Sequence, residues 1–259
     1  MTEAHVINVK ERTDRWAKIQ EMWKDQPIVL NRRDAIKING TDIPDAYHAV
    51  FLKHREILTT ASKLGEKHIL IMEDDAAPCK DFARHWLAIK EYLDARDDWE
   101  LFNGGMLMIR DCVDKIVRID HKDNKDPTMV LGVWRGAMAH FLYMKVEPCL
   151  KKMADWEAEG KQMFDGWYSH KMKTLASIPY LAYQCDGYSD AAGENRTWEE
   201  RFTFEEDMMK YALREFMTPG AVKPQIDHAD PRQTLLRERD RTSGGFAPPN
   251  DSEWKIVTK

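Results

Sequence analysis

The chain has 259 residues, of which 43% are hydrophobic and 32% charged, and its formal net charge is -5. This composition excludes a disordered chain and predicts a folded protein with a full core. The net charge gives no general electrostatic footprint for nucleic acid, although it leaves room for a local basic groove. The four cysteines are widely spaced and form no Cys-x-x-Cys pair, so we expect reduced thiols. The sequence shows no signal-peptide pattern and no apolar run of about 18 residues, so we expect a cytoplasmic protein without a transmembrane segment.

The N-terminal segment predicts a strand, a basic loop and a helix. His5–Val9 is a short apolar strand, and the helix that follows has an apolar face from Trp16 to Trp23. The loop between them supplies Arg12 and Arg15. These guanidinium groups and the first amides of the helix could bind a phosphate. The alternative is that both arginines lie on a solvated helix start.

The acids in the middle of the chain are the feature around which the other elements are arranged. A second short strand, Pro27–Leu30, and a long amphipathic helix from Asp45 to Leu64 precede them. The apolar run Ile69–Met72 then leads directly into Glu73-Asp74-Asp75, which predicts a strand buried on both faces with acids at its carboxyl end.

Open α/β sheets bind ligands outside the carboxyl ends of their strands. Adjacent carboxylates repel one another unless a cation or hydrogen bonds relieve them, and hard oxygen ligands suit Mg²⁺ or Mn²⁺. The three acids therefore predict a metal site. The alternative is a charged loop that opens the next helix.

Strands and helices continue to alternate after the acids. We expect a helix capped by Asp81, a strand at Trp99–Asn103 closed by Gly104-Gly105, a polar loop at Asp120–Pro127, a strand at Ala137–Met144, helices beginning at Glu147 and Phe164, a strand at Pro179–Tyr183, a polar loop at Gln184–Asp190 and a helix from about Glu199. The alternation predicts an α/β fold with a mostly parallel central sheet flanked by helices. We expect a single domain over residues 1–259, in which residues from about 220 form a C-terminal tail or extension.

Several of these segments, taken in order, resemble a known family. They are the N-terminal Ile-Asn-Val-Lys-Glu-Arg-Thr-Asp-Arg, the Ile69–Ala76 segment, Asp81-Phe82 and the strand at Asp98–Phe102. Together they are similar to glycosyltransferase family twenty-five, the lipooligosaccharide galactosyl- and glucosyltransferases, over roughly residues 5 to 190. The stretch after Asp45 departs from the pattern of that family, so the acceptor is open. The resemblance implies a GT-A fold and a nucleoside-diphosphate sugar donor, with a UDP-sugar favoured.

The resemblance also implies a single inverting displacement assisted by Mn²⁺ or Mg²⁺. Asp75 is the expected metal ligand, Glu73 is expected to reach the metal or the ribose, and Asp165 is the expected base, with a helix N-cap as its alternative role. The remaining assignments are Asn8, Arg12, Arg15, Arg33, Glu73 and Asp74 for the donor, His228 or His170 as a further metal ligand, and Asp186 and Asp190 as alternative bases.

The leading hypothesis is therefore a metal-dependent, inverting hexosyltransferase that acts on a glycan. Three alternatives stay open: a nucleotidyltransferase, although no Gly-rich phosphate loop is present; a GT-A scaffold that has lost turnover; and a glycosyltransferase acting on a modified DNA base. Arg32-Arg33 and Arg237–Arg241 supply the local positive charge that the last alternative needs. The sequence does not define the donor sugar, the nucleotide base, the acceptor or the oligomeric state.

Overall fold

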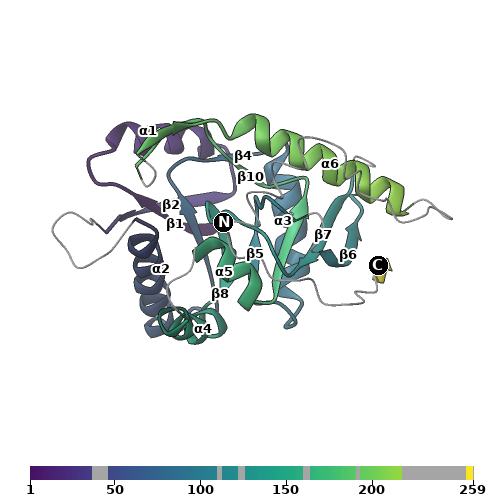
Figure 1. Cartoon of the computed structure of the whole chain (residues 1–259), viewed down its shortest axis with the longest axis horizontal. Helices are drawn as coiled ribbons and strands as arrows, with labels where there is room; N and C mark the ends of the chain where they lie inside the picture. Colours follow the sequence, from purple (N-terminus) through teal and green to yellow (C-terminus); the bar gives the residue numbers. More distant parts are fainter. Residues whose placement is uncertain are drawn as a thin grey trace.

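A computed structural model of the chain describes residues 1–36, 46–109, 113–121, 126–159, 164–190, 193–217 and 255–258. In these residues a large mixed sheet has helices on both faces (Figure 1). Nine strands follow the order β13-β6-β7-β9-β5-β8-β3-β1-β2. They are β1 (Thr2–Asn8), β2 (Ile28–Asp34), β3 (His68–Glu73), β5 (Leu101–Asn103), β6 (Val113–Ile119), β7 (Thr128–Val133), β8 (Phe141–Lys145), β9 (Thr174–Ile178) and β13 (Lys255–Thr258). The helices are α1 (Thr13–Trp23), α2 (Ala46–Lys63), α3 (Phe82–Asp94), α4 (Val146–Ala158), α5 (Phe164–Lys171) and α6 (Glu199–Met217).

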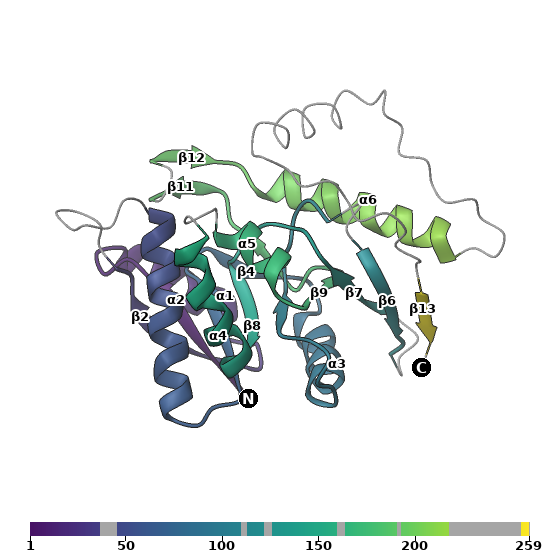
Figure 2. The same cartoon turned by 60° about the horizontal axis from the view of Figure 1, so that its bottom comes forward.

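The direction of the strands determines where a ligand could bind. Only β7 and β8 of these described strands run against the rest, so the carboxyl ends of β1, β2, β3, β5 and β9 meet at one edge. The expected mostly parallel sheet is confirmed in this sense. Two short ladders lie outside the main sheet: β4 (Ala76–Pro78) pairs with β10 (Ala182–Gln184), and β11 (Gly187–Ser189) pairs with β12 (Glu194–Arg196). Figure 2 shows the β11–β12 hairpin and α6 lying along the same edge as the carboxyl ends.

The predicted strand before the acids is confirmed as β3, and its side chains explain why it is central. Leu70 and Met72 join a core with α1 and α3, whereas Ile69 and Ile71 join a second core with α2, α4 and α5. All four side chains are at most 3% exposed, so both faces of β3 are buried as expected. Because this strand is fixed from both sides, the acids that follow it have defined positions.

A third core lies under β6, β7 and β9, where α6 packs Phe202, Met209 and Leu213 against the sheet. The helix expected from Glu199 is thus confirmed. The strands β6 and β7 on either side of the predicted polar loop were not predicted, and residues 122–125 of that loop lie outside the described residues. The start of α2, expected at Asp45, also falls on an undescribed residue.

Several element predictions were wrong. The strand expected at Ala137–Met144 begins only at Phe141. Of the strand expected at Pro179–Tyr183, only the last two residues lie in a strand, β10, and the strand before it, β9, was not predicted. β9 ends directly before Pro179, which has no N–H to donate to a ladder. Part of the polar loop expected at Gln184–Asp190 is β11. Asp81 stands at the N-cap of α3 but makes no side-chain capping bond, because its backbone is left-handed with φ of 61°.

The paired glycines after β5 serve the packing of the chain rather than a ligand. A Cβ at Gly105 would collide with the backbone oxygen of Ala182 and the ring of His140. The carbonyl of Gly104 accepts hydrogen bonds from the amides of Leu181 and Ala182, at 2.6 and 3.1 Å. The segment that leads into β10 can therefore approach the end of β5 closely.

No helix among the described residues is long and apolar enough to cross a membrane.

Candidate functional site

The site begins at the end of β1, where Asn8 is 1% exposed. Its side-chain Nδ2 donates to Asp74 Oδ2 at 2.6 Å and to the backbone oxygen of Arg12 at 3.1 Å. One buried amide thus joins the end of β1, the loop before α1 and the acids after β3. Asn8 therefore orients the site, while its Oδ1 is buried and has no hydrogen-bond partner among the described residues.

Asp74 is the acid whose charge is already compensated. Arg15 Nη1 lies 2.9 Å from Asp74 Oδ1, and the other carboxylate oxygen accepts from Asn8. The side chain of Asp74 is 7% exposed. Burial raises its pKa, and the hydrogen bond from Asn8 and the charge of Arg15 oppose that rise. Both oxygens are therefore engaged within the protein, and Asp74 holds Arg15 in place.

Asp75 lies on the other side of this ion pair and is only partly satisfied. Gln184 Nε2 donates to Asp75 Oδ2 at 2.9 Å, and the amide of Cys185 donates to the backbone oxygen of Asp75 at 2.8 Å. Asp75 Oδ1 is buried and has no hydrogen-bond partner among the described residues, and the same is true of Gln184 Oε1. Burial raises the pKa of Asp75, while the bond from Gln184 lowers it. An unpaired carboxylate oxygen of this kind is a ready ligand for a cation.

A pocket opens beside Asp75, between the start of α1 and the chain that leads from β10 to α6. Its lining combines two basic residues, Arg15 and Lys18, with three acids, Asp74, Asp75 and Asp186, so both a cation and a ligand with negative groups find partners there. The residues that line it are Arg15, Lys18, Asp74, Asp75, Gln184, Cys185, Asp186, Gly187, Tyr188, Ser189 and Trp198.

Glu73 ends β3 and is the acid with the least favourable surroundings. Burial raises its pKa well above the ordinary value, and the negative charges of Asp75, Asp74 and Asp165 raise it further. Its side chain accepts no hydrogen bond within the described residues, and its amide donates to the backbone oxygen of His140 at 3.1 Å. A carboxyl group with a raised pKa near other acids is characteristic of catalytic sites.

Asp165, the predicted base, is brought into this acidic group from α5. Its Oδ2 accepts from the amide of Met138 at 2.9 Å, and its Oδ1 accepts from the amide of Gly166 at 2.8 Å. Met138 is held with φ of 90°, a strained value for a residue with a Cβ, and its carbonyl accepts from Asn103 Nδ2 at 2.6 Å. Asp165 therefore has a positioning role for the segment before β8, whatever else it does.

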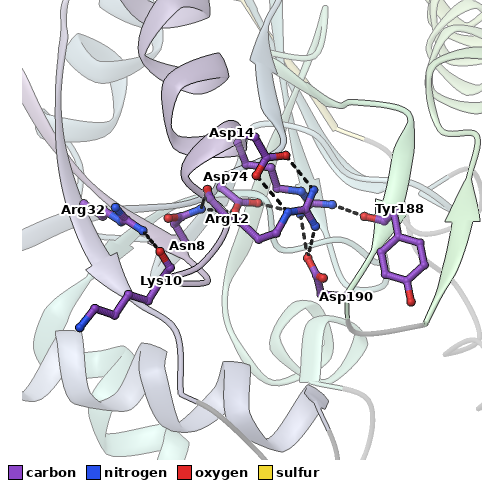
Figure 3. A network of polar contacts seen from close by, with 9 residues as sticks. Asn8, Lys10, Arg12, Asp14, Arg32, Asp74, Tyr188 and Asp190 are labelled. Atoms are coloured by element: carbon purple, nitrogen blue, oxygen red, sulfur yellow. Dashed lines mark hydrogen bonds and ion pairs between the residues drawn. The ribbon is translucent and has the colours of Figure 1, made fainter.

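Arg12, directly before α1, and Arg15, in its first turn, meet the β11–β12 hairpin, and Figure 3 shows Arg12 beside Asp190. Arg12 Nη1 lies 2.7 Å from Asp190 Oδ2, and Arg15 Nη1 lies 3.7 Å from the same oxygen. Arg15 Nη2 also donates to the backbone oxygen of Tyr188. Both arginines stand at the partly exposed start of α1, and their guanidinium groups face Asp74 and the hairpin.

Other predicted residues lie elsewhere or have other partners. Arg33 donates from Nε to His5 Nδ1 at 2.7 Å, on β2 and β1, and is not brought to the pocket. Asp186, an alternative base, caps α6, because its Oδ1 accepts from the amides of Trp198 and Glu199. His170 is exposed in α5.

His228 lies outside the described residues. Within the part of the chain that the structure describes, no three His, Cys, Asp or Glu side chains are grouped so as to hold a metal by themselves.

The sequence did not indicate Gln184 or Lys18 as site residues. Gln184 carries no motif, and its contact with Asp75 joins positions 109 residues apart in sequence. Lys18 is one of several charged positions on α1, and only its place on the pocket wall distinguishes it.

Comparisons with known proteins do not assign the chain to a family. No protein family and no curated protein sequence matches it. Among solved structures it is similar to a protein described as A197 from STIV, with a TM-score of 0.37, 14% identity, and coverage of 71% of this chain and 85% of that chain. It is also similar to a glycosyltransferase involved in the glycosylation of the major capsid of PBCV-1, with a TM-score of 0.34, 9% identity, and coverage of 62% and 67%. A third similarity is to apo UDP-glucose pyrophosphorylase, with a TM-score of 0.30, 10% identity and coverage of 82% of each chain. Similarities of this size do not define a function, so the function has to be argued from the site.

Proposed function

We propose that the chain is a metal-dependent glycosyltransferase that moves a sugar from a nucleoside-diphosphate sugar to an acceptor hydroxyl. The observation that supports this most directly is the unequal pairing of three consecutive acids at the carboxyl end of β3. Asp74 is satisfied by Arg15 and Asn8, whereas Asp75 keeps an unpaired oxygen and Glu73 accepts no hydrogen bond within the described residues. Two uncompensated carboxylates beside a basic wall suit a divalent cation together with an anionic ligand.

The residues present fit such a cation. Mg²⁺ is usually bound by one or two carboxylates and completed by substrate phosphates and water, rather than by a full protein cage. Asp75 would be the main ligand and Glu73 the second, so the small number of grouped ligands in the described chain agrees with this type of site. When bound, the cation would neutralise the negative charge that develops on the departing diphosphate. His228 stays a proposed further ligand.

The donor would lie in the pocket with its diphosphate toward the basic wall. Arg15 is fixed by Asp74, so its guanidinium group is oriented before a ligand arrives, and Lys18 on the pocket wall adds positive charge. Arg12 does not line the pocket but shares the carboxylate of Asp190 with Arg15. Arginine binds phosphate oxygens through paired N–H groups. A UDP-sugar is the donor we propose. Arg33 has no part in this arrangement, because it lies against His5.

For the transfer itself we propose Asp165 as the base. Its carboxylate would take the proton of the acceptor hydroxyl while the hydroxyl oxygen attacks the anomeric carbon from the face opposite the diphosphate. The bond from that carbon to the diphosphate oxygen breaks, and the diphosphate leaves with the electron pair, so the anomeric centre is inverted. Glu73 is the second candidate for this role, because burial and the neighbouring acids raise its pKa, and a carboxyl group with a raised pKa binds a proton more readily.

The acceptor that we propose is a glycan. Tyr188, 46% exposed, lies at the pocket and offers a ring on which a sugar could stack. A modified DNA base stays the alternative acceptor, and the two can be compared directly by supplying each to the same enzyme and donor.

The test is a screen of nucleotide sugars with and without Mn²⁺, read by thermal shift and by the products released. A glycosyltransferase releases a nucleoside diphosphate and a free or transferred sugar. A nucleotidyltransferase instead consumes a nucleoside triphosphate and releases pyrophosphate. Binding without turnover of any donor, with every acceptor class, would indicate a scaffold and contradict the proposal.

A further inference from the structure

The guanidinium groups of Arg12 and Arg15 are already bound to acceptor oxygens of the β11–β12 hairpin. Arg12 pairs with the carboxylate of Asp190, Arg15 lies 3.7 Å from the same carboxylate, and Arg15 also binds the backbone oxygen of Tyr188. Figure 3 shows these contacts converging on the hairpin from the start of α1. The hairpin is thus held on the pocket by the positive groups that the proposed function assigns to the donor.

We propose that Asp190 is an internal anion that occupies the diphosphate site of Arg12 and Arg15 in the free protein, and that a diphosphate ligand must displace it. The inference rests on the proposed function for the identity of the natural ligand. It concerns how access to that same site is regulated.

The carboxylate of Asp190 and a diphosphate offer arginine the same kind of hydrogen-bond acceptor. A carboxylate and a phosphate group both present oxygen pairs that match the N–H fork of arginine, so they compete for the same donors. The diphosphate carries more charge and more acceptor oxygens, and it therefore can replace Asp190 on both arginines at once. The carbonyl of Tyr188 would be released in the same step, because it shares Arg15 with the carboxylate.

The hairpin itself is built so that this exchange costs little. Its ladder joins only three residues on each strand, Gly187–Ser189 to Glu194–Arg196, and much of it is exposed. The side chains of Arg12 and Asp190 are 26% and 37% exposed, and ion pairs with this access to water are weak. The contact is therefore strong enough to place the hairpin but weak enough for a ligand to compete.

The experiment compares Asp190→Asn with Glu194→Gln in the full chain. Both variants remove one negative charge from the same hairpin, but Glu194 pairs with Arg196 and not with the two arginines of α1. The probes are inorganic pyrophosphate and UDP, measured by isothermal titration calorimetry without metal. Hydrogen exchange of the hairpin amides is measured in parallel, with and without pyrophosphate.

We expect Asp190→Asn to bind pyrophosphate about 3- to 10-fold more tightly than the wild type, the scale of a partly exposed ion pair to two arginines. Glu194→Gln should change the affinity by much less. In the wild type, pyrophosphate should speed exchange of the hairpin amides, and Asp190→Asn should show the faster exchange without ligand.

Unchanged or weaker pyrophosphate binding by Asp190→Asn would overturn the inference, as would equal gains in both variants, which would show a general charge effect. Absence of pyrophosphate binding in all three proteins would overturn it as well. If pyrophosphate binds as expected but no nucleotide sugar binds or reacts, the proposed function fails and the inference about Asp190 stands.

Discussion

Replacement of Asp165 by Asn tests the base and the local structure in one variant. The aspartate uses both oxygens as acceptors, one for the amide of Met138 and one for the amide of Gly166. Asparagine offers one oxygen and one NH₂ group, so one of the two backbone amides loses its acceptor and meets a donor instead. An unsatisfied buried donor costs about 1–3 kcal/mol. Because both hydrogen bonds to Asp165 are only partly buried, we expect Asp165→Asn to lower the free energy of unfolding by about 1 kcal/mol, the low end of that range.

The effect on the reaction is separate and larger if the carboxylate is the base. General base catalysis contributes roughly 10²–10⁴-fold to the rate. We expect the transfer rate per folded molecule to fall by about this factor, while donor affinity changes little. The measurements are urea unfolding, donor binding by calorimetry and initial rates of transfer, corrected for the folded fraction.

Asn103→Ala is the matched control for this variant. It removes the hydrogen bond to the carbonyl of Met138, on the other side of the same strained residue, and the one that Asn103 Oδ1 accepts from the amide of Gly105, and it leaves the carboxylate of Asp165 in place. We expect a loss of stability at least as large as that of Asp165→Asn, with a much smaller loss of rate. If Asp165→Asn is less stable but fully active per folded molecule, Asp165 is only a positioning residue, and Glu73 becomes the candidate base.

Three more predictions concern the metal, the donor and a buried histidine of α2. Asp75→Asn should abolish Mn²⁺ binding, measured by electron paramagnetic resonance, and transfer, with little change in melting temperature; wild-type rates of this variant in chelator would exclude the metal. Arg15→Ala should weaken donor binding by about 1–3 kcal/mol, the scale of a hydrogen bond to a charged group, whereas Arg33→Ala, which breaks only the contact to His5, should leave the calorimetric dissociation constant unchanged. Burial lowers the pKa of His54 to about 3, so between its unfolded pKa of 6.5 and that value only the unfolded chain takes up the proton, and stability falls as the pH falls. Wild type should therefore lose about 2 kcal/mol more than His54→Leu between pH 8 and pH 5 in urea unfolding, and equal losses would contradict the assignment.

Sequence patterns predicted those strands and helices that show a clear pattern of apolar residues within one short segment. The apolar run before Glu73 predicted β3, and the helical spacing in residues 46–63 predicted α2. The acids at the end of a buried strand correctly indicated which edge of the sheet carries the candidate site. The strands β6 and β7 were missed although they had a signal. Val113–Ile119 is rich in β-branched apolar residues mixed with charged ones, and residues 129–133 are a run without polar side chains. The polar loop between the two segments was interpreted without pairing them as a hairpin.

The pairings within the site could not be predicted, because they join positions far apart in the chain. Arg15 meets Asp74 across 59 residues, Asp75 meets Gln184 across 109, and Arg12 meets Asp190 across 178. No local pattern encodes such contacts. The three acids are adjacent in sequence, yet β3 ends at Glu73 and the chain turns at Asp74 and Asp75. Glu73 therefore lies near the charge of Asp165, whereas Asp74 pairs with Arg15. The sequence predicted a site at these three acids, and the structure shows which partner each acid has.

The position of β2 has a consequence for the behaviour of the protein in concentrated solution. It is the outermost of the described strands on its side of the sheet, so one row of its backbone N–H and C=O groups has no neighbouring strand. An exposed row of this kind is a template for pairing with another chain. The first half of β2 is Ile-Val-Leu, but the second half is Asn-Arg-Arg-Asp. Charged side chains on an edge oppose the approach of a second strand, so Arg32 and Arg33 protect the protein against edge-to-edge aggregation.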